Sequence, residues 1–151
     1  MTNDRAFQKF AGVLAILAGV AGFLYSVSFI IIARSSPELG ASLSAFFLLL
    51  GGVLTGGALV GLYKRLEAGD NGFALWALIL AVGGALGAAV HGGYDLANAF
   101  NPPASNLPAL ADLPNQVDPR GLLTFGVAGM SAVIFSLVIV RSGALSKPLG
   151  Y

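Results

Sequence analysis

The sequence predicts an all-α integral membrane protein, a four-helix bundle in which every helix crosses the bilayer. Hydrophobic residues make up 56% of the 151 residues and charged residues only 10%, whereas charged residues are about a quarter of a typical soluble domain. Four long runs contain no charged residue, and a spanning helix needs about 20 predominantly apolar residues. None of the runs alternates apolar and polar residues as a transmembrane strand would.

The first two runs predict a helical hairpin. The first run, residues 10–33, is longer than the apolar core of a signal peptide, roughly 7–15 residues, so we expect a retained span. The second run, residues 39–63, begins just after Pro37, and proline is favoured in the first turn of a helix. Because only residues 34–38 join the two runs, their helices should be antiparallel neighbours.

The third and fourth spans are expected at residues 72–97 and 121–140, with the charged segment 64–71 before them. The loop between them, residues 98–120, contains five prolines, which block regular helix and strand pairing. Apolar residues recur through this loop, so it is either a flap lying on the bundle surface or a mobile linker. The whole chain, residues 1–151, should form a single transmembrane domain.

The basic residues predict the orientation. Six of the eight fall on one side of the predicted topology. These are Arg5, Lys9, Lys64, Arg65, Arg141 and Lys147. Only Arg34 and Arg120 fall on the other side. The positive-inside rule then places both termini in the cytoplasm, as expected for a multi-pass protein of a cell's inner (plasma) membrane.

Small residues at four-residue intervals predict close helix contacts in the second and third spans. The second span has two GxxxG spacings, Gly52 with Gly56 and Gly57 with Gly61. The third span has one row at Ala81, Ala85, Ala89 and Gly93 and a neighbouring row at Gly84, Ala88 and Gly92. Lipid gives little hydrophobic drive for association, so close backbone approach must provide it. The rows could serve packing within the chain or a seam for an oligomer or partner.

The polar residues of the third span gather at its end. His91, Asp95 and Asn98 are spaced to share one helix face, with Tyr94 beside them. Arg120 precedes the fourth span and should lie at the same depth. Three interpretations are open: a structural ion pair between Asp95 and either His91 or Arg120, a ligand or lipid-headgroup site, and a catalytic or metal site.

Several functions are disfavoured by composition. The chain has no cysteine and one histidine, so disulfides, thiolate-bound zinc, iron–sulfur clusters and metal sites with several in-chain histidines are excluded. The first, second and fourth runs hold no acidic or basic residue, which an ion-coupled carrier usually needs. A net charge of +1 gives no basis for nucleic-acid binding. We therefore expect no catalytic residues, no metal and no cofactor.

Three segments carry a resemblance to a known family: residues 22–26 (GFLYS), 91–98 (HGGYDLAN) and 118–121 (DPRG). Together they resemble a family of bacterial multi-pass membrane proteins with a domain of unknown function, and the similarity extends over the whole chain. The resemblance implies a polytopic bacterial membrane protein and supplies no activity or catalytic residue. The chain is shorter than typical members, so it is either a short member or part of a longer protein.

These observations predict a non-enzymatic membrane protein, an accessory or scaffolding subunit. Its expected partners are membrane lipids and either copies of itself or other membrane subunits, joined through the small-residue rows. The alternative is a small-molecule or lipid-binding transporter with a polar site in the outer leaflet. A third hypothesis is a membrane enzyme that uses His91 and Asp95 as an acid–base pair.

Overall fold

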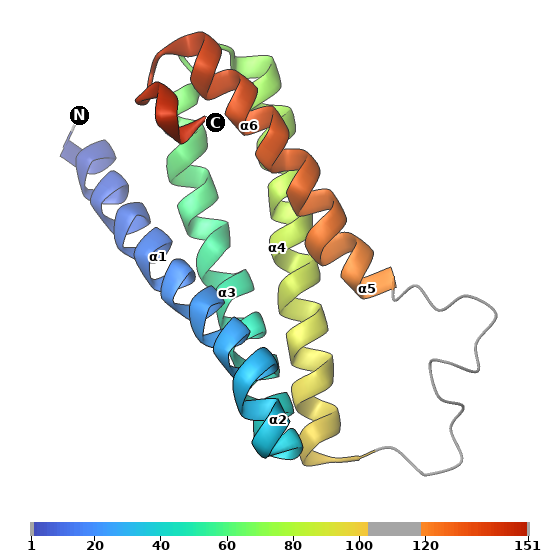
Figure 1. Ribbon diagram of the computed structural model, residues 1–151. Helices are drawn as coiled ribbons and strands as arrows, with labels where there is room; N and C mark the ends of the chain where they lie inside the picture. The colour runs from blue at the N-terminus through green and yellow to red at the C-terminus, as the bar shows by residue number, and fades with distance from the viewer. Residues whose placement is uncertain (1, 103–118, 151) are drawn as a thin grey trace.

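The computed structural model describes residues 2–102 and 119–150 (Figure 1). These residues form helices and short connections, with no strand among them. Four helical stretches are long and apolar enough to cross a membrane: Arg5–Ser35, Pro37–Leu66, Asn71–Phe100 and Leu122–Ser142. The prediction of an all-α protein with four spanning helices is therefore confirmed.

The first span is longer than its apolar run. It consists of α1 (Thr2–Val27), a π-helical segment η1 (Ser28–Ile32) and the short α2 (Ala33–Ser35). The wider π-helical turn was not predicted, because hydropathy does not distinguish it from α-helix. Within it the Ser28 hydroxyl donates a hydrogen bond to the Leu24 carbonyl oxygen at 2.7 Å, which satisfies a carbonyl near the change in helix type.

Short connections place the next two helices as predicted. Ser36 adopts an extended backbone that ends the first span, and α3 (Pro37–Leu66) starts with proline in its first turn. The α4 helix (Asn71–Phe100) begins after Asp70, whose carboxylate accepts a hydrogen bond from the Phe73 backbone N–H at 3.3 Å. This cap satisfies one of the free N–H groups at the start of the helix.

The fourth span again contains a π-helical segment. It runs through α5 (Pro119–Gly121), η3 (Leu122–Val127) and α6 (Ala128–Ser142). A 3₁₀ turn, η4 (Lys147–Leu149), follows. Gly143 ends α6 in the left-handed region, with φ 64°, which glycine adopts without strain. The flap or linker predicted at residues 98–120 lies mostly outside the described residues.

Helices that follow one another in sequence are neighbours in space (Figure 1). The α3 helix lies between α1 and α4, and α4 also packs against η3 and α6. Among the described residues, α1 and α6 do not meet, so the bundle is open along one side. Both termini lie at the same end of the molecule (Figure 1), which we call the termini end.

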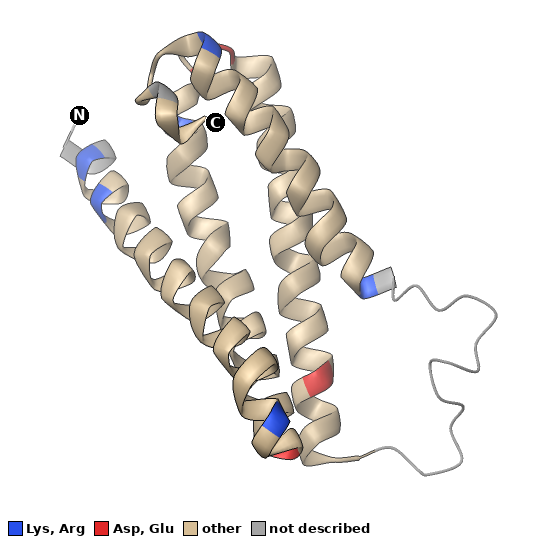
Figure 2. Ribbon diagram, viewed as in Figure 1, with Lys and Arg blue, Asp and Glu red and all other residues tan. Residues whose placement is uncertain are grey.

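The best-enclosed core lies toward the termini end. It consists of eight buried residues, namely Leu66, Ala74, Ala77, Ala81, Ile134, Phe135, Val138 and Ile139. Acidic and basic residues lie toward the two ends of the helices, and the ribbon between them carries none among the described residues (Figure 2). This distribution suits helices whose middle parts contact lipid.

Glycine permits close approach between α3 and α4. A Cβ atom added at Gly52 would lie 2.6 Å from the Ala85 carbonyl oxygen and 2.7 Å from the Ala89 backbone nitrogen. A Cβ added at Gly92 would lie 2.6 Å from the Ala45 carbonyl oxygen. No side chain larger than hydrogen fits at either glycine without separating the helices.

The second GxxxG pair faces a different helix. Gly57 lies against the Leu14 side chain of α1, and Gly61 lies against Ala11. Gly56, by contrast, has nothing within 4 Å of an added Cβ. In α4, Ala81, Ala85 and Gly84 are buried, while Ala88, Ala89 and Gly93 are half-buried. Gly84 faces Ala128 of α6, where an added Cβ would lie 2.8 Å from the alanine Cβ.

Candidate functional site

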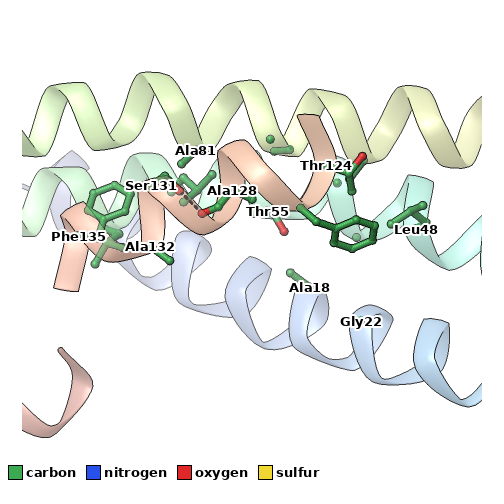
Figure 3. Close-up of a pocket in the computed structure, with 18 of the residues that line it drawn as sticks. Ala18, Gly22, Leu48, Thr55, Ala81, Thr124, Ala128, Ser131, Ala132 and Phe135 are labelled. Atoms are coloured by element: carbon green, nitrogen blue, oxygen red, sulfur yellow. Dashed lines mark hydrogen bonds between the residues drawn. The ribbon is translucent and has the colours of Figure 1, made fainter. Parts of the chain in front are cut away.

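An apolar groove separates α1 from α6, and α3 and α4 form its floor (Figure 3). Its volume is about 560 Å³, and most of its lining is alanine, glycine, leucine and phenylalanine. Thr55, Thr124, Ser131, Ser136 and Tyr25 supply the hydroxyl groups of the lining. The groove therefore suits an apolar occupant that meets a few hydroxyl groups.

Two of these hydroxyl groups are already engaged as donors. Thr124 donates to the Arg120 carbonyl oxygen, and Ser131 donates to the Ala128 carbonyl oxygen, both at 2.7 Å. Each can still offer a lone pair to an occupant, but its proton is used within its own helix. These two positions would recognise a hydrogen-bond donor, and the apolar lining around them disfavours a charged one.

The α1 helix lines the groove with Ala18, Gly22 and Tyr25, and a row of small exposed residues on α1 meets the groove at Gly22. The row consists of Gly12, Ala15, Gly19, Gly22 and Ser26, at alternating spacings of three and four residues. An added Cβ would meet nothing within 4 Å at any of its three glycines. Larger apolar residues occupy the adjoining lipid-facing side, where Ile16 and Phe23 are 69% and 68% exposed.

Sequence analysis missed this small-residue row in α1. Its spacing is visible in the sequence, but the packing prediction was made for the second and third spans because small residues are more frequent there. The structure shows that several of those glycines are used between helices of the same chain. In the most apolar window of the first span only 11% of residues are buried, against 33% in α4 and in the fourth span. The first span is thus the least enclosed.

The polar cluster predicted at the end of the third span lies at the end of the bundle opposite the termini. Arg120 Nη1 donates to Asp95 Oδ1 at 2.7 Å, and His91 Nε2 lies 3.3 Å from Asp95 Oδ2. The Arg120 guanidinium carbon lies 4.7 Å from the centre of the Tyr94 ring, which adds a cation–π contact. The structure therefore brings four of the five predicted residues together and ties α4 to the start of the fourth span.

Asn98, the fifth predicted residue, faces a different neighbour. With Asp95 it lines a shallow hollow of about 400 Å³ that also includes Ser44 of α3 and Phe29 of η1. Asp95 therefore stands between the ion-pair cluster and this hollow, with its side chain 41% exposed. A small polar molecule or lipid headgroup placed in the hollow would meet this carboxylate and the Asn98 amide.

The described residues give no arrangement for metal binding, since no three His, Asp or Glu side chains among them gather closely enough to hold an ion. The described cluster contains one carboxylate, one imidazole and one guanidinium. Its contacts are those of an ion-pair network at the end of a span.

The four apolar helices define the class: the chain is a polytopic membrane protein. No known protein family, curated protein or solved structure matches it. Membership in the bacterial family that the three sequence segments resemble therefore stays a prediction.

Proposed function

We propose that the chain is a non-enzymatic membrane subunit that associates with a second copy of itself through the small-residue row of α1. The observation that carries this proposal is the uncovered row beside an open apolar groove. At Gly12, Gly19 and Gly22 an added Cβ would meet no neighbour within 4 Å. In lipid, rows of small residues favour helix association because the backbones can approach closely.

The spacing of the row favours a second copy as the partner. Copies inserted in the same orientation present their α1 helices in parallel about a two-fold axis along the membrane normal. Spacings of three and four residues keep one seam facing the partner in a parallel, left-handed helix pair. The row Gly12, Ala15, Gly19, Gly22 and Ser26 has this spacing over its whole length.

The groove gives the second copy room to pack. Its floor on α3 runs from Phe47 to Leu62, which at 1.5 Å per residue is about 22 Å. That length is about three quarters of the hydrocarbon thickness of a bilayer, which is about 30 Å. Gly52, Gly57 and Gly61 already face helices of the same chain, and the first span is the least buried of the four, so we assign the association to α1.

Cysteine cross-linking in native membranes tests this proposal. The chain has no cysteine, so any disulfide that forms in a variant joins the introduced thiols. We expect Gly19→Cys to form a disulfide-linked dimer on mild oxidation. Val20→Cys, one residue further round the exposed surface of α1, should stay monomeric and serves as the matched control.

A bulky residue in the same row should weaken the association. We expect Gly19→Leu to raise the dissociation constant of the dimer in lipid at least tenfold, about 1.4 kcal/mol, while Val20→Leu leaves it unchanged. Native mass spectrometry of gently extracted protein gives the stoichiometry. A wild-type monomer together with equal cross-linking at positions 19 and 20 would remove the proposal.

We infer that the termini end lies in the cytoplasm of a bacterial cell. The support is the charge distribution, since six of the eight basic residues lie in the first turns of α1, in the last turn of α3, and in or just beyond the last turn of α6 (Figure 2). A tag at the N-terminus should be protected from an added protease in intact spheroplasts and become cleavable only after lysis.

A second function, binding of a small molecule or lipid headgroup, is favoured by the hollow beside Asp95 and Asn98. In that case Asp95→Asn would lower ligand retention and leave thermal stability unchanged. A fall in stability without a change in bound molecules would support a structural role for the cluster.

A further inference from the structure

We propose a binding site for the phosphate group of an anionic phospholipid at the termini end, between the start of α1 and the end of α3. A hollow of about 410 Å³ lies here, lined by Arg5, Gln8, Lys9 and Arg65. Three of the four lining residues carry positive charge. None of the functions considered above uses this hollow.

Gln8 holds the arginine of this site in place. Its Nε2 donates to the Gly61 carbonyl oxygen at 3.2 Å, and its Oε1 accepts from Arg65 Nε at 3.1 Å. The guanidinium is thus attached through one nitrogen to a half-buried side chain that is itself bound to α3. Its two terminal nitrogens can bind a phosphate through two parallel hydrogen bonds.

The charge at the hollow is unbalanced locally. Arg5 and Lys9 stand four residues apart on α1, so they lie near each other on one side of the helix. The nearest lysine of α3, Lys64, is already bound to Glu67, with nitrogen–oxygen distances of 3.2 and 3.3 Å. No carboxylate lines the hollow among the side chains that the structure describes. A phosphodiester would supply the missing negative charge.

The position of the hollow favours a lipid over a free phosphate. The apolar run of α1 begins directly after Lys9, and Phe10 and Val13 are 56% and 54% exposed. A phospholipid with its phosphate in the hollow would place its acyl chains along this exposed face. Basic residues at a membrane surface attract anionic lipid, and each contributes about fivefold in affinity. Phe10 and Val13 lie on a different side of α1 from the small-residue row, so the acyl chains would not cover that row.

Native mass spectrometry of the full chain in mixed micelles tests the site. The micelles contain phosphatidylglycerol and phosphatidylcholine in equal amounts, and the retained lipids are counted. We expect wild type to retain phosphatidylglycerol preferentially, and Lys9→Gln or Arg65→Gln to lower that retention about fivefold each. Arg141→Gln, an exposed basic residue in the last turn of α6 at the same end, should leave it unchanged.

Gln8→Leu separates a built site from general surface charge. It keeps every basic residue but removes the hydrogen bond that orients Arg65, so we expect retention to fall while the net charge stays the same. Unchanged retention in Gln8→Leu, or an equal loss in Arg141→Gln, would overturn the proposal. Displacement of the lipid by millimolar glycerol 3-phosphate would also overturn it in favour of a soluble phosphate. Lys9→Gln keeps the test valid if a variant at position 8 or 65 fails to fold, because Lys9 is exposed.

Discussion

Gly52→Ala should lower the free energy of unfolding by about 3 kcal/mol, at the upper end of the usual cost of overpacking. The added methyl group would lie 2.6 Å from the Ala85 carbonyl oxygen and 2.7 Å from the Ala89 backbone nitrogen. Both are backbone atoms of α4, and neither can move aside like a flexible side chain. The α3 and α4 helices must therefore separate along their closest contact.

Gly56→Ala is the matched control, in the same helix and the same GxxxG pair. Nothing lies within 4 Å of an added Cβ at this position. Alanine is the better helix former by about 1 kcal/mol, so this variant should be as stable as wild type or slightly more stable.

Reversible unfolding in mixed micelles, followed by circular dichroism as the fraction of dodecyl sulfate rises, compares the two variants directly. Equal losses at positions 52 and 56 would mean that the close approach at Gly52 does not limit stability. A stable Gly52→Ala would contradict the α3–α4 packing itself.

The two GxxxG pairs also show how much of the helix packing could be predicted from the sequence. Successive residues of an α-helix are about 100° apart, so Gly61, nine residues after Gly52, lies about 180° away. The two pairs therefore had to face different neighbours, and the structure places them against α4 and α1. Spacing alone could predict that α3 lies between two helices. It could not predict that Gly56 would face open space, because this depends on how the helices diverge.

The candidate site was predictable to a similar extent. The pairing of Asp95 with His91 and Arg120 follows from helical spacing and from the expected depth of the spans. The open side between α1 and α6 could not be predicted in this way, because it depends on an absence of contact between helices that are far apart in sequence. The π-helical segments at Ser28–Ile32 and Leu122–Val127 also have no hydropathy signal, since their residues are as apolar as their neighbours.

Asp95→Leu should lower the free energy of unfolding by about 2 kcal/mol. The change removes the carboxylate that accepts from Arg120 Nη1 at 2.7 Å and faces His91 Nε2 at 3.3 Å. The Arg120 guanidinium then loses this acceptor and faces a leucine near the end of the span, where a charge is costly to keep. The cost stays below that of a fully buried pair because the two side chains are 41% and 31% exposed.

Asp95→Asn provides a graded control. Its amide oxygen can still accept a hydrogen bond from Arg120, although without charge, so about half of the loss should remain. The same micelle unfolding experiment measures both variants. If both are as stable as wild type, the ion pair is not structural, and the neighbouring hollow with Asn98 becomes the better explanation for a carboxylate at this position.

The double variant Asp95→Leu/Arg120→Leu distinguishes the interaction between the two residues from the contribution that each side chain makes alone. Replacing both partners with apolar residues also removes the charge that Asp95 balances, and should recover most of the stability lost in Asp95→Leu. The Tyr94 contact with the guanidinium, 4.7 Å from its ring centre, is lost as well, so recovery should fall somewhat short of wild type. A double-mutant cycle should then give a coupling energy of about 1–2 kcal/mol. Additive losses would instead mean that the two residues act on stability independently, despite their contact.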